Sequence, residues 1–72
     1  MIKILLKVEL AKNNMTQKEL AIKTGIRPPT ISAFCNNTAK HIPIADLDKI
    51  CSVLHCSPAD LIVYSEDPER EL

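Results

Sequence analysis

MTQKELAIKTGIRPPTISAFCNN, which occupies residues 15–37, contains two helix-start signals with one glycine between them. Thr16 and Glu19 have the spacing of a capping box, in which each side chain bonds the other residue's backbone N–H. Gly25 is the only glycine of the chain, and it stands where a short helix needs a residue at positive φ to reverse the chain. The pattern predicts a helix of about eight residues between Thr16 and Gly25.

A second short helix is predicted directly after this turn. Pro28 and Pro29 are tolerated in a first helical turn, because the N–H groups there have no intrahelical acceptor. The helix then runs to about Asn36 and buries Ile31 and Phe34. Two short helices joined by a tight turn form a helix-turn-helix arrangement. We expect Ile31 to fill the space between them.

The residues before this segment fit two interpretations. Leu6 and Leu10 are one helical turn apart, which predicts a first helix that ends near Asn13. Apolar residues also alternate from Ile2 onward, which predicts a short strand. Both alternatives remain open for the first few residues.

The second half of the chain carries the clearest helical pattern. Apolar residues recur there at spacings of three and four, which predicts a helix over about residues 44–55; they are Ile44, Leu47, Ile50, Cys51 and Leu54. Ser57, Pro58 and Asp60 form another helix start. The fifth helix is short, because the segment 62–64 favours an extended chain.

Length and composition limit the classes of protein that the chain can belong to. Seventy-two residues make one small core, and 46% hydrophobic with 25% charged residues is a globular balance. No apolar stretch approaches the roughly 20 residues of a membrane span. The segment 1–6 is too short for a signal peptide. We expect a cytoplasmic protein without a membrane partner.

The net charge of zero hides a strong asymmetry. Residues 1–42 carry seven basic and two acidic side chains, a net charge of +5, whereas residues 43–72 carry two basic and seven acidic ones, a net charge of −5. Such a distribution is typical of a protein with one face toward a polyanion, although two solvated faces of unlike sign also produce it.

Cysteine and histidine spacing argues against a metal or an enzyme. Three cysteines without a secretory signal predict no disulfide framework. Cys51 and His55 are four residues apart, but they fit no recurrent zinc pattern. Cys35 with His41 is a poor candidate for a nucleophile and its base. We therefore expect no metal, no cofactor and no enzymatic activity.

Residues 15–37 closely resemble the Cro/lambda-repressor-like helix-turn-helix family, also called the XRE family. The matching positions are Gln17, Ala21, Gly25, Ile31 and Asn36. Residues 47–61 are similar to the fourth and fifth helices of this family. The resemblance implies an all-α fold, a compact five-helix DNA-binding domain over residues 1–66. Short N- and C-terminal β-strands and a frayed acidic tail over residues 67–72 complete the expected chain.

The resemblance also implies that the helix over residues 28–36 enters the DNA major groove. The residues at the start of such a helix face base edges, and here they are Arg27, Pro28, Pro29, Thr30 and Ala33. Family members often carry Gln or Ser at the matching places, so direct hydrogen bonding is weaker in this sequence. Proline and alanine contact thymine methyl groups, while Arg27 and Thr30 bond bases or phosphates. The alternative is that the two prolines serve only as a rigid helix start.

Side chains suited to contacts with DNA phosphates are better represented than side chains suited to hydrogen bonds with bases. The residues of the family that match Gln17 and Asn36 commonly bond phosphates, and Lys18, Lys40 and His41 are placed to join them. The alternative for Gln17 and Asn36 is local helix capping, and for Lys18 a solvated surface.

These expectations combine into a function. The chain is predicted to be a sequence-specific transcriptional regulator, a repressor, that binds double-stranded DNA as a homodimer on an inverted repeat. Its dimer seam would use the extended ends, with the first strand pairing with the segment after the fifth helix. We expect no small-molecule effector, because no residues remain for an effector domain. The alternative is a protein-interaction adaptor that kept the fold without operator binding.

Overall fold

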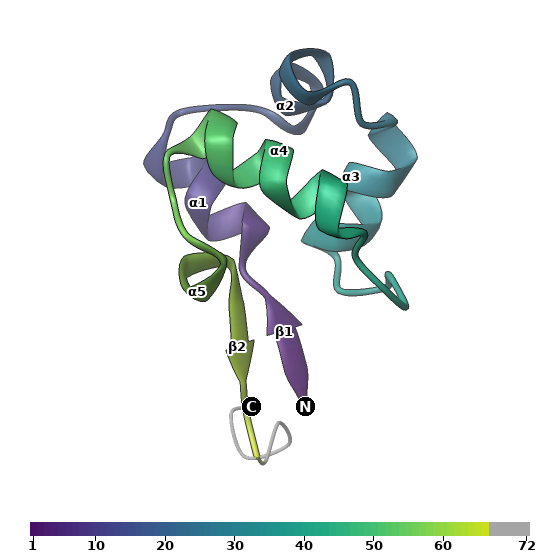
Figure 1. Cartoon of the computed structure of the whole chain (residues 1–72), viewed down its shortest axis with the longest axis vertical. Helices are drawn as coiled ribbons and strands as arrows, with labels where there is room; N and C mark the ends of the chain where they lie inside the picture. The colour runs from purple at the N-terminus through teal and green to yellow at the C-terminus, as the bar shows by residue number, and fades with distance from the viewer. Residues whose placement is uncertain (67–72) are drawn as a thin grey trace.

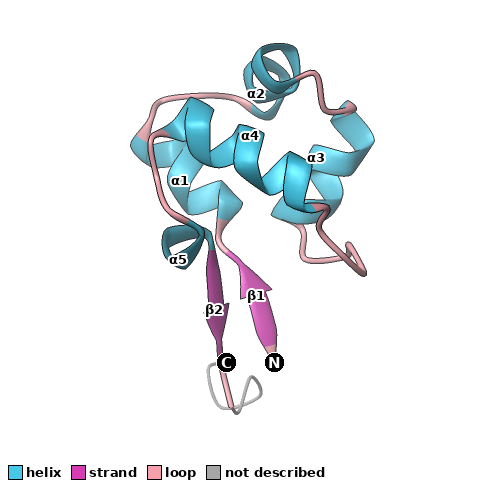
Figure 2. Cartoon of the chain, viewed as in Figure 1, coloured by secondary structure: helices cyan, strands magenta, loops and turns pink. Residues whose placement is uncertain are grey.

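Five helices surround one aliphatic core within residues 1–66, the part of the chain that the computed structural model describes, and a two-stranded ribbon projects from them (Figure 1). The elements in chain order are β1 (Ile2–Ile4), α1 (Leu6–Lys12), α2 (Gln17–Thr24), α3 (Pro28–Cys35), α4 (Ile44–Leu54), α5 (Pro58–Leu61) and β2 (Ile62–Tyr64). The helical fold class with short terminal strands is confirmed, as Figure 2 shows. The frayed tail expected over residues 67–72 lies outside the described residues.

Local signals produce the pair of helices α2 and α3 as predicted. The Thr16 hydroxyl accepts a hydrogen bond from the Glu19 N–H at 3.1 Å, and the Glu19 carboxylate accepts one from the Thr16 N–H, also at 3.1 Å. At the other end of α2, Gly25 has φ of 75° and donates its N–H to the Ala21 carbonyl at 2.9 Å. The capping box and the left-handed cap therefore set both ends of α2.

Thr24 strengthens the turn in a way that the sequence pattern did not reveal. Its side chain is buried, and its hydroxyl donates to the Leu20 carbonyl at 2.7 Å while accepting from the Ile26 N–H at 3.2 Å. One hydroxyl thus connects the last turn of α2 to the residue after Gly25, and its burial carries no unsatisfied polar group.

The core is formed by apolar side chains from every helix. Leu20 of α2 and Ile31 of α3 have no exposed surface at all, and Ala21 is buried at the contact of the same two helices. Ile31 is thus fully buried in the core, as its predicted place between the two helices requires. The other buried hydrophobic residues are Leu6, Leu10, Ile26, Phe34, Cys35, Ile50, Leu54 and Leu61.

The pairing of β1 and β2 resolves the ambiguity at the start of the chain. Residues 2–4 form a strand, and the helix begins at Leu6. The strands are antiparallel, with Ile2 opposite Tyr64 and Ile4 opposite Ile62. The Leu5 N–H donates to the Leu61 carbonyl at 2.6 Å. The pairing of the first strand with the segment after the fifth helix is confirmed.

Asn37 attaches the outer edge of β1 to the end of α3. Its side-chain oxygen accepts from the Ile4 N–H at 2.6 Å, and its side-chain nitrogen donates to the Ile4 carbonyl at 3.2 Å. The amide therefore bonds both polar groups of Ile4, as a neighbouring strand would. Asn37 itself adopts φ of 59°, a left-handed conformation that asparagine tolerates better than most residues.

Helix α4 corrects one part of the predicted core. Ile50 and Leu54 are buried, but Ile44 is 85% exposed. Ile44 is the first residue of α4, so it lies before the turns whose apolar side chains reach the core. Val53, which lies off the predicted stripe, instead packs against the core. The apolar spacing predicted the helix correctly, but it wrongly placed Ile44 on the buried face of the helix.

Helix α5 is a single turn with a complete capping box. The Asp60 carboxylate accepts from the Ser57 N–H at 2.9 Å and from the Ser57 hydroxyl at 3.2 Å. These two hydrogen bonds lower the pKa of Asp60, which is otherwise solvent-exposed. The start signal at Ser57 is confirmed.

The turn at Gly25 generates a prediction. A Cβ atom at this position would meet nothing within 4 Å, so Gly25→Ala carries only the cost of a left-handed conformation, about 1–2 kcal/mol. We expect the free energy of unfolding, measured in urea, to fall by about 1 kcal/mol. Gly25→Asn is the matched control and should lose less, because asparagine tolerates this conformation. Equal losses in the two variants would contradict the explanation.

Candidate DNA-binding face

The first turn of α3 is exposed and rigid. Arg27 precedes the helix in an extended conformation, and Pro28 and Pro29 occupy its first two positions. The Arg27 carbonyl accepts from the N–H groups of Thr30 and Ile31 at 3.0 and 3.1 Å. Both prolines and Arg27 are exposed. The start of α3 therefore presents fixed side chains to an outside partner.

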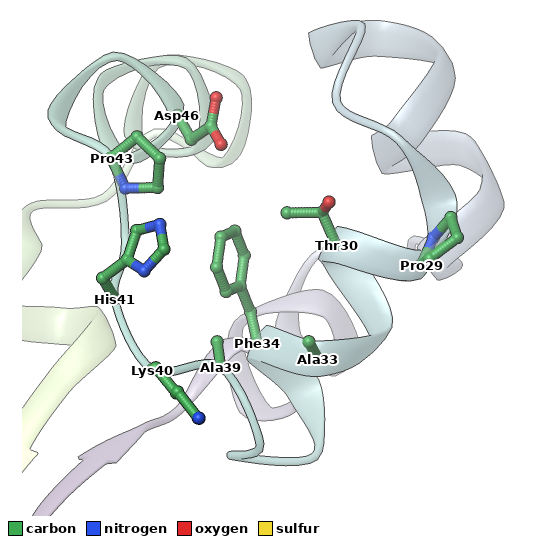
Figure 3. Close-up of a pocket in the computed structure, with 9 residues that line it drawn as sticks. All are labelled: Pro29, Thr30, Ala33, Phe34, Ala39, Lys40, His41, Pro43 and Asp46. Atoms are coloured by element: carbon green, nitrogen blue, oxygen red, sulfur yellow. The ribbon is translucent and has the colours of Figure 1, made fainter.

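One face of α3 lines a groove on the surface of the protein. Pro29 and Thr30 lie four and three residues before Ala33, so all three contribute to this face. Figure 3 shows them on one side of the groove, with the Phe34 ring rising between them and the opposite wall. The opposite wall comes from the loop after α3 and the start of α4, and it consists of Ala39, Lys40, His41, Pro43 and Asp46.

The groove brings together five of the ten residues that the sequence predicted for DNA. Pro29, Thr30 and Ala33 belong to the predicted base-contacting set, and Lys40 and His41 to the predicted phosphate-contacting set. The two sets come from separate segments of the chain. The tertiary fold brings them together in one groove, which the sequence alone did not predict.

The other five predicted residues lie outside this groove. Arg27 and Pro28 stand at the exposed start of α3. Gln17 and Lys18 are the first two residues of α2, with Gln17 half-buried and Lys18 exposed. Asn36 is exposed at the end of α3, and its side-chain nitrogen donates to the Ser32 hydroxyl at 3.2 Å.

Asp46 is a groove residue that the sequence did not single out. It is half-buried and lies in the first turn of α4, on the wall opposite Thr30 (Figure 3). A carboxylate accepts hydrogen bonds from the amino group of cytosine and repels phosphates. The only signal for Asp46 in the sequence was its place at the start of the predicted fourth helix. The groove thus combines the cationic Lys40 and the imidazole of His41 with one anionic acceptor.

The environments of the cysteines give no sign of catalytic chemistry. Cys35 is buried, and this burial raises the pKa of its thiol, with Lys7 acting in the opposite direction. His41 is exposed on the groove. Within residues 1–66 no group of three or more metal-ligating side chains occurs, and no helix there has the length and apolarity to cross a bilayer.

The two short helices, the Gly25 turn and the open face of α3 define a helix-turn-helix DNA-binding domain. A family model described as a Cro/C1-type helix-turn-helix DNA-binding domain matches residues 5–67. The chain therefore belongs to this family, and the resemblance seen in its sequence is confirmed. The family is one of DNA-binding transcriptional regulators, which are not typically enzymes.

Similar proteins agree with this assignment. The chain is 37% identical over 62 residues to YozG, an uncharacterized HTH-type transcriptional regulator of Bacillus subtilis (strain 168), and the match covers 86% of this chain and 74% of YozG. It is also similar to the crystal structure of a proposed DNA-binding protein from Bacteroides fragilis, with a TM-score of 0.78 and 32% sequence identity. That match covers 88% of this chain and 100% of the other.

Proposed function

We propose that this protein is a sequence-specific transcriptional repressor that inserts the start of α3 into the major groove of double-stranded DNA. The observation that carries the proposal is the groove itself, where Pro29, Thr30 and Ala33 face Lys40 and His41. Such a face offers base contacts from a helix and phosphate contacts from a loop at the same time. Repression then needs only occupancy of the site.

The base contacts follow from the chemistry of each side chain. Arg27 reaches the acceptors of a guanine, and Thr30 bonds a base edge or a phosphate. Pro28, Pro29 and Ala33 have no side-chain hydrogen-bonding groups, so they contact thymine methyl groups. Two fixed proline rings also limit how the helix docks, which makes the shape of the DNA part of the recognition.

We assign the phosphate contacts to residues before and after α3, the helix proposed to enter the major groove. Gln17 and Lys18 lie at the start of α2, where free N–H groups of the first turn favour an anion. Asn36 ends α3, and Lys40 and His41 follow in the loop. These groups position the domain on the duplex without reading its sequence.

The second candidate is a protein-interaction adaptor. The neutral total charge and the carboxylate of Asp46 in the groove favour it. The +5 charge of residues 1–42 favours DNA instead, since the half of the sequence that contains the helix-turn-helix carries seven basic side chains. Measured DNA binding distinguishes the two candidates.

We propose further that the working unit is a homodimer on an inverted repeat, because one module covers only a few base pairs. The ribbon of β1 and β2 has an apolar face formed by Ile2, Ile4, Ile62 and Tyr64, since residues two apart share a face. Ile4 and Ile62 pack against the core, whereas Ile2 and Tyr64 are 60% and 68% exposed. The exposed end of this face is the proposed seam for a second copy.

DNA binding should depend strongly on salt. If each domain neutralises about 3 to 5 phosphates, log affinity should fall against log salt with a slope of about −3 to −5 per domain. Fragments selected from random DNA supply the preferred site, and fluorescence anisotropy over a salt series gives the slope. Absence of binding at 50 mM salt, or affinity that does not change with salt, would favour the adaptor.

The two sets of contacts should respond differently to substitution. Gln17→Ala and Asn36→Ala should weaken binding to all duplexes about equally, whereas Arg27→Ala and Thr30→Ala should change discrimination at one or two base pairs by about 1–3 kcal/mol. Affinities are measured for a panel of single-base variants of the selected site. Lys49→Ala is the control, because Lys49 is exposed on α4 and does not line the groove. Identical profiles from all four variants would refute the division of roles.

The dimer is tested by sedimentation velocity at micromolar concentration. Tyr64→Asp places a charge on the exposed end of the ribbon and should shift the protein toward monomer, because it would bury an unpaired carboxylate. Tyr64→Phe keeps the ring and should leave the dimer intact. A wild-type protein that stays monomeric on and off DNA, with a selected site lacking two-fold symmetry, would defeat the proposal.

A further inference from the structure

Cys51 and Cys56 meet at the C-terminal end of α4. His55 ends this helix in a left-handed conformation with φ of 53°. The Cys56 N–H then donates back to the Cys51 carbonyl at 3.1 Å. The His55 N–H also donates to the Cys51 carbonyl, and in left-handed helix caps of this kind the residues at the two ends of the cap lie on the same side and often pack together. In this protein, both of those residues are cysteines.

The two thiols are direct neighbours. The Cys51 side chain lies near enough to Cys56 to contribute to the raised pKa of its thiol, and both residues are free and half-buried beside the core. Burial first, then the nearby Cys51 and Glu9, raise the pKa of Cys56 to about 11. The Cys56 thiol is therefore protonated at neutral pH while Cys51 is a free thiol.

Cys51 is the more accessible member of the pair. It lines a surface groove between α4 and α5, together with Ile44, Leu47, Asp48 and Pro58. Cys35, by contrast, is 4% exposed and lies on α3 within the core. A small molecule in solution thus reaches Cys51 through the groove, whereas Cys56 does not line it.

We propose that Cys51 and Cys56 form a redox modification site, which closes to an intrachain disulfide by exchange with a low-molecular-weight disulfide. The Cys51 thiolate attacks one sulfur of that disulfide, forming a mixed disulfide and releasing the first small thiolate. Cys56 then gives its thiol proton to the first released small thiolate and attacks the Cys51 sulfur, which releases the second small thiolate. The two cysteines lose two electrons and two protons, and the small disulfide gains them as two thiols.

The fold already holds the backbones of Cys51 and Cys56 together. A disulfide needs the two backbones to lie close together, and the hydrogen bond from Cys56 to Cys51 already holds them so. The bond closes a loop of residues 51–56, which restricts the unfolded chain and stabilises the end of α4. Figure 1 shows that α4 begins beside α3 and ends above α1. Neither cysteine lines the groove on α3, and the inference does not depend on DNA binding.

The test uses the full chain incubated with oxidised glutathione. Intact mass spectrometry should show the loss of two hydrogens without a retained glutathione, and peptide mapping should link Cys51 to Cys56 with Cys35 free. Dithiothreitol should restore the original mass. The oxidised monomer should unfold at a temperature at least about 5 °C higher than the reduced one.

Two single variants serve as matched controls. Cys56→Ser leaves Cys51 without a resolving thiol, so it should retain one glutathione and gain no stability. Cys51→Ser should acquire glutathione more slowly, because Cys56 is the less accessible thiol. The inference is overturned if the wild-type protein keeps glutathione on both cysteines, forms disulfide-linked dimers, pairs Cys35, or does not react. Equal rates in the two variants would overturn the order of attack.

Discussion

The left-handed turn at Gly25 is the constraint on which the remaining structure depends. It reverses the chain within a few residues, so that Leu20 before it and Ile31 after it become fully buried against the same core. The hydroxyl of Thr24 holds both sides of the turn through two hydrogen bonds. Because Ile31 must face inward, the residues on the other side of α3 must face outward. The groove is thus a consequence of how α2 and α3 pack.

Phe34 connects the core to this outward face. It is only 1% exposed, yet its ring contributes to the groove between Thr30 and His41 (Figure 3). An aromatic ring in this position excludes water from below the groove and fixes the spacing of its two walls. The stability of the domain and the shape of its DNA-binding face therefore rest on some of the same side chains.

Features that depend on nearby residues were predictable from the sequence, and features that depend on distant ones were not. The capping boxes act over three residues, so Thr16 and Ser57 identified their helices directly. The alternation from Ile2 onward was ambiguous, because its strand exists through pairing with β2, at the other end of the described chain. The bond from Asn37 to Ile4, the exposure of Ile44 and the position of Asp46 in the groove likewise depend on tertiary packing.

The distribution of charge is relevant to how a protein with no net charge would bind a polyanion such as DNA. Several acidic groups are engaged within the fold: Glu9 is buried and lies 3.2 Å from Lys12, and Asp60 caps α5. A net charge of zero keeps general attraction to DNA weak, which lowers binding to the many non-specific sites of a genome. Inside the groove, the Asp46 carboxylate also weakens non-specific attraction to DNA, because it repels phosphates. It still accepts a hydrogen bond from the amino group of a base. Under the proposed function, recognition by such a face would depend on correct base contacts and on the proposed pairing of two copies, more than on charge alone.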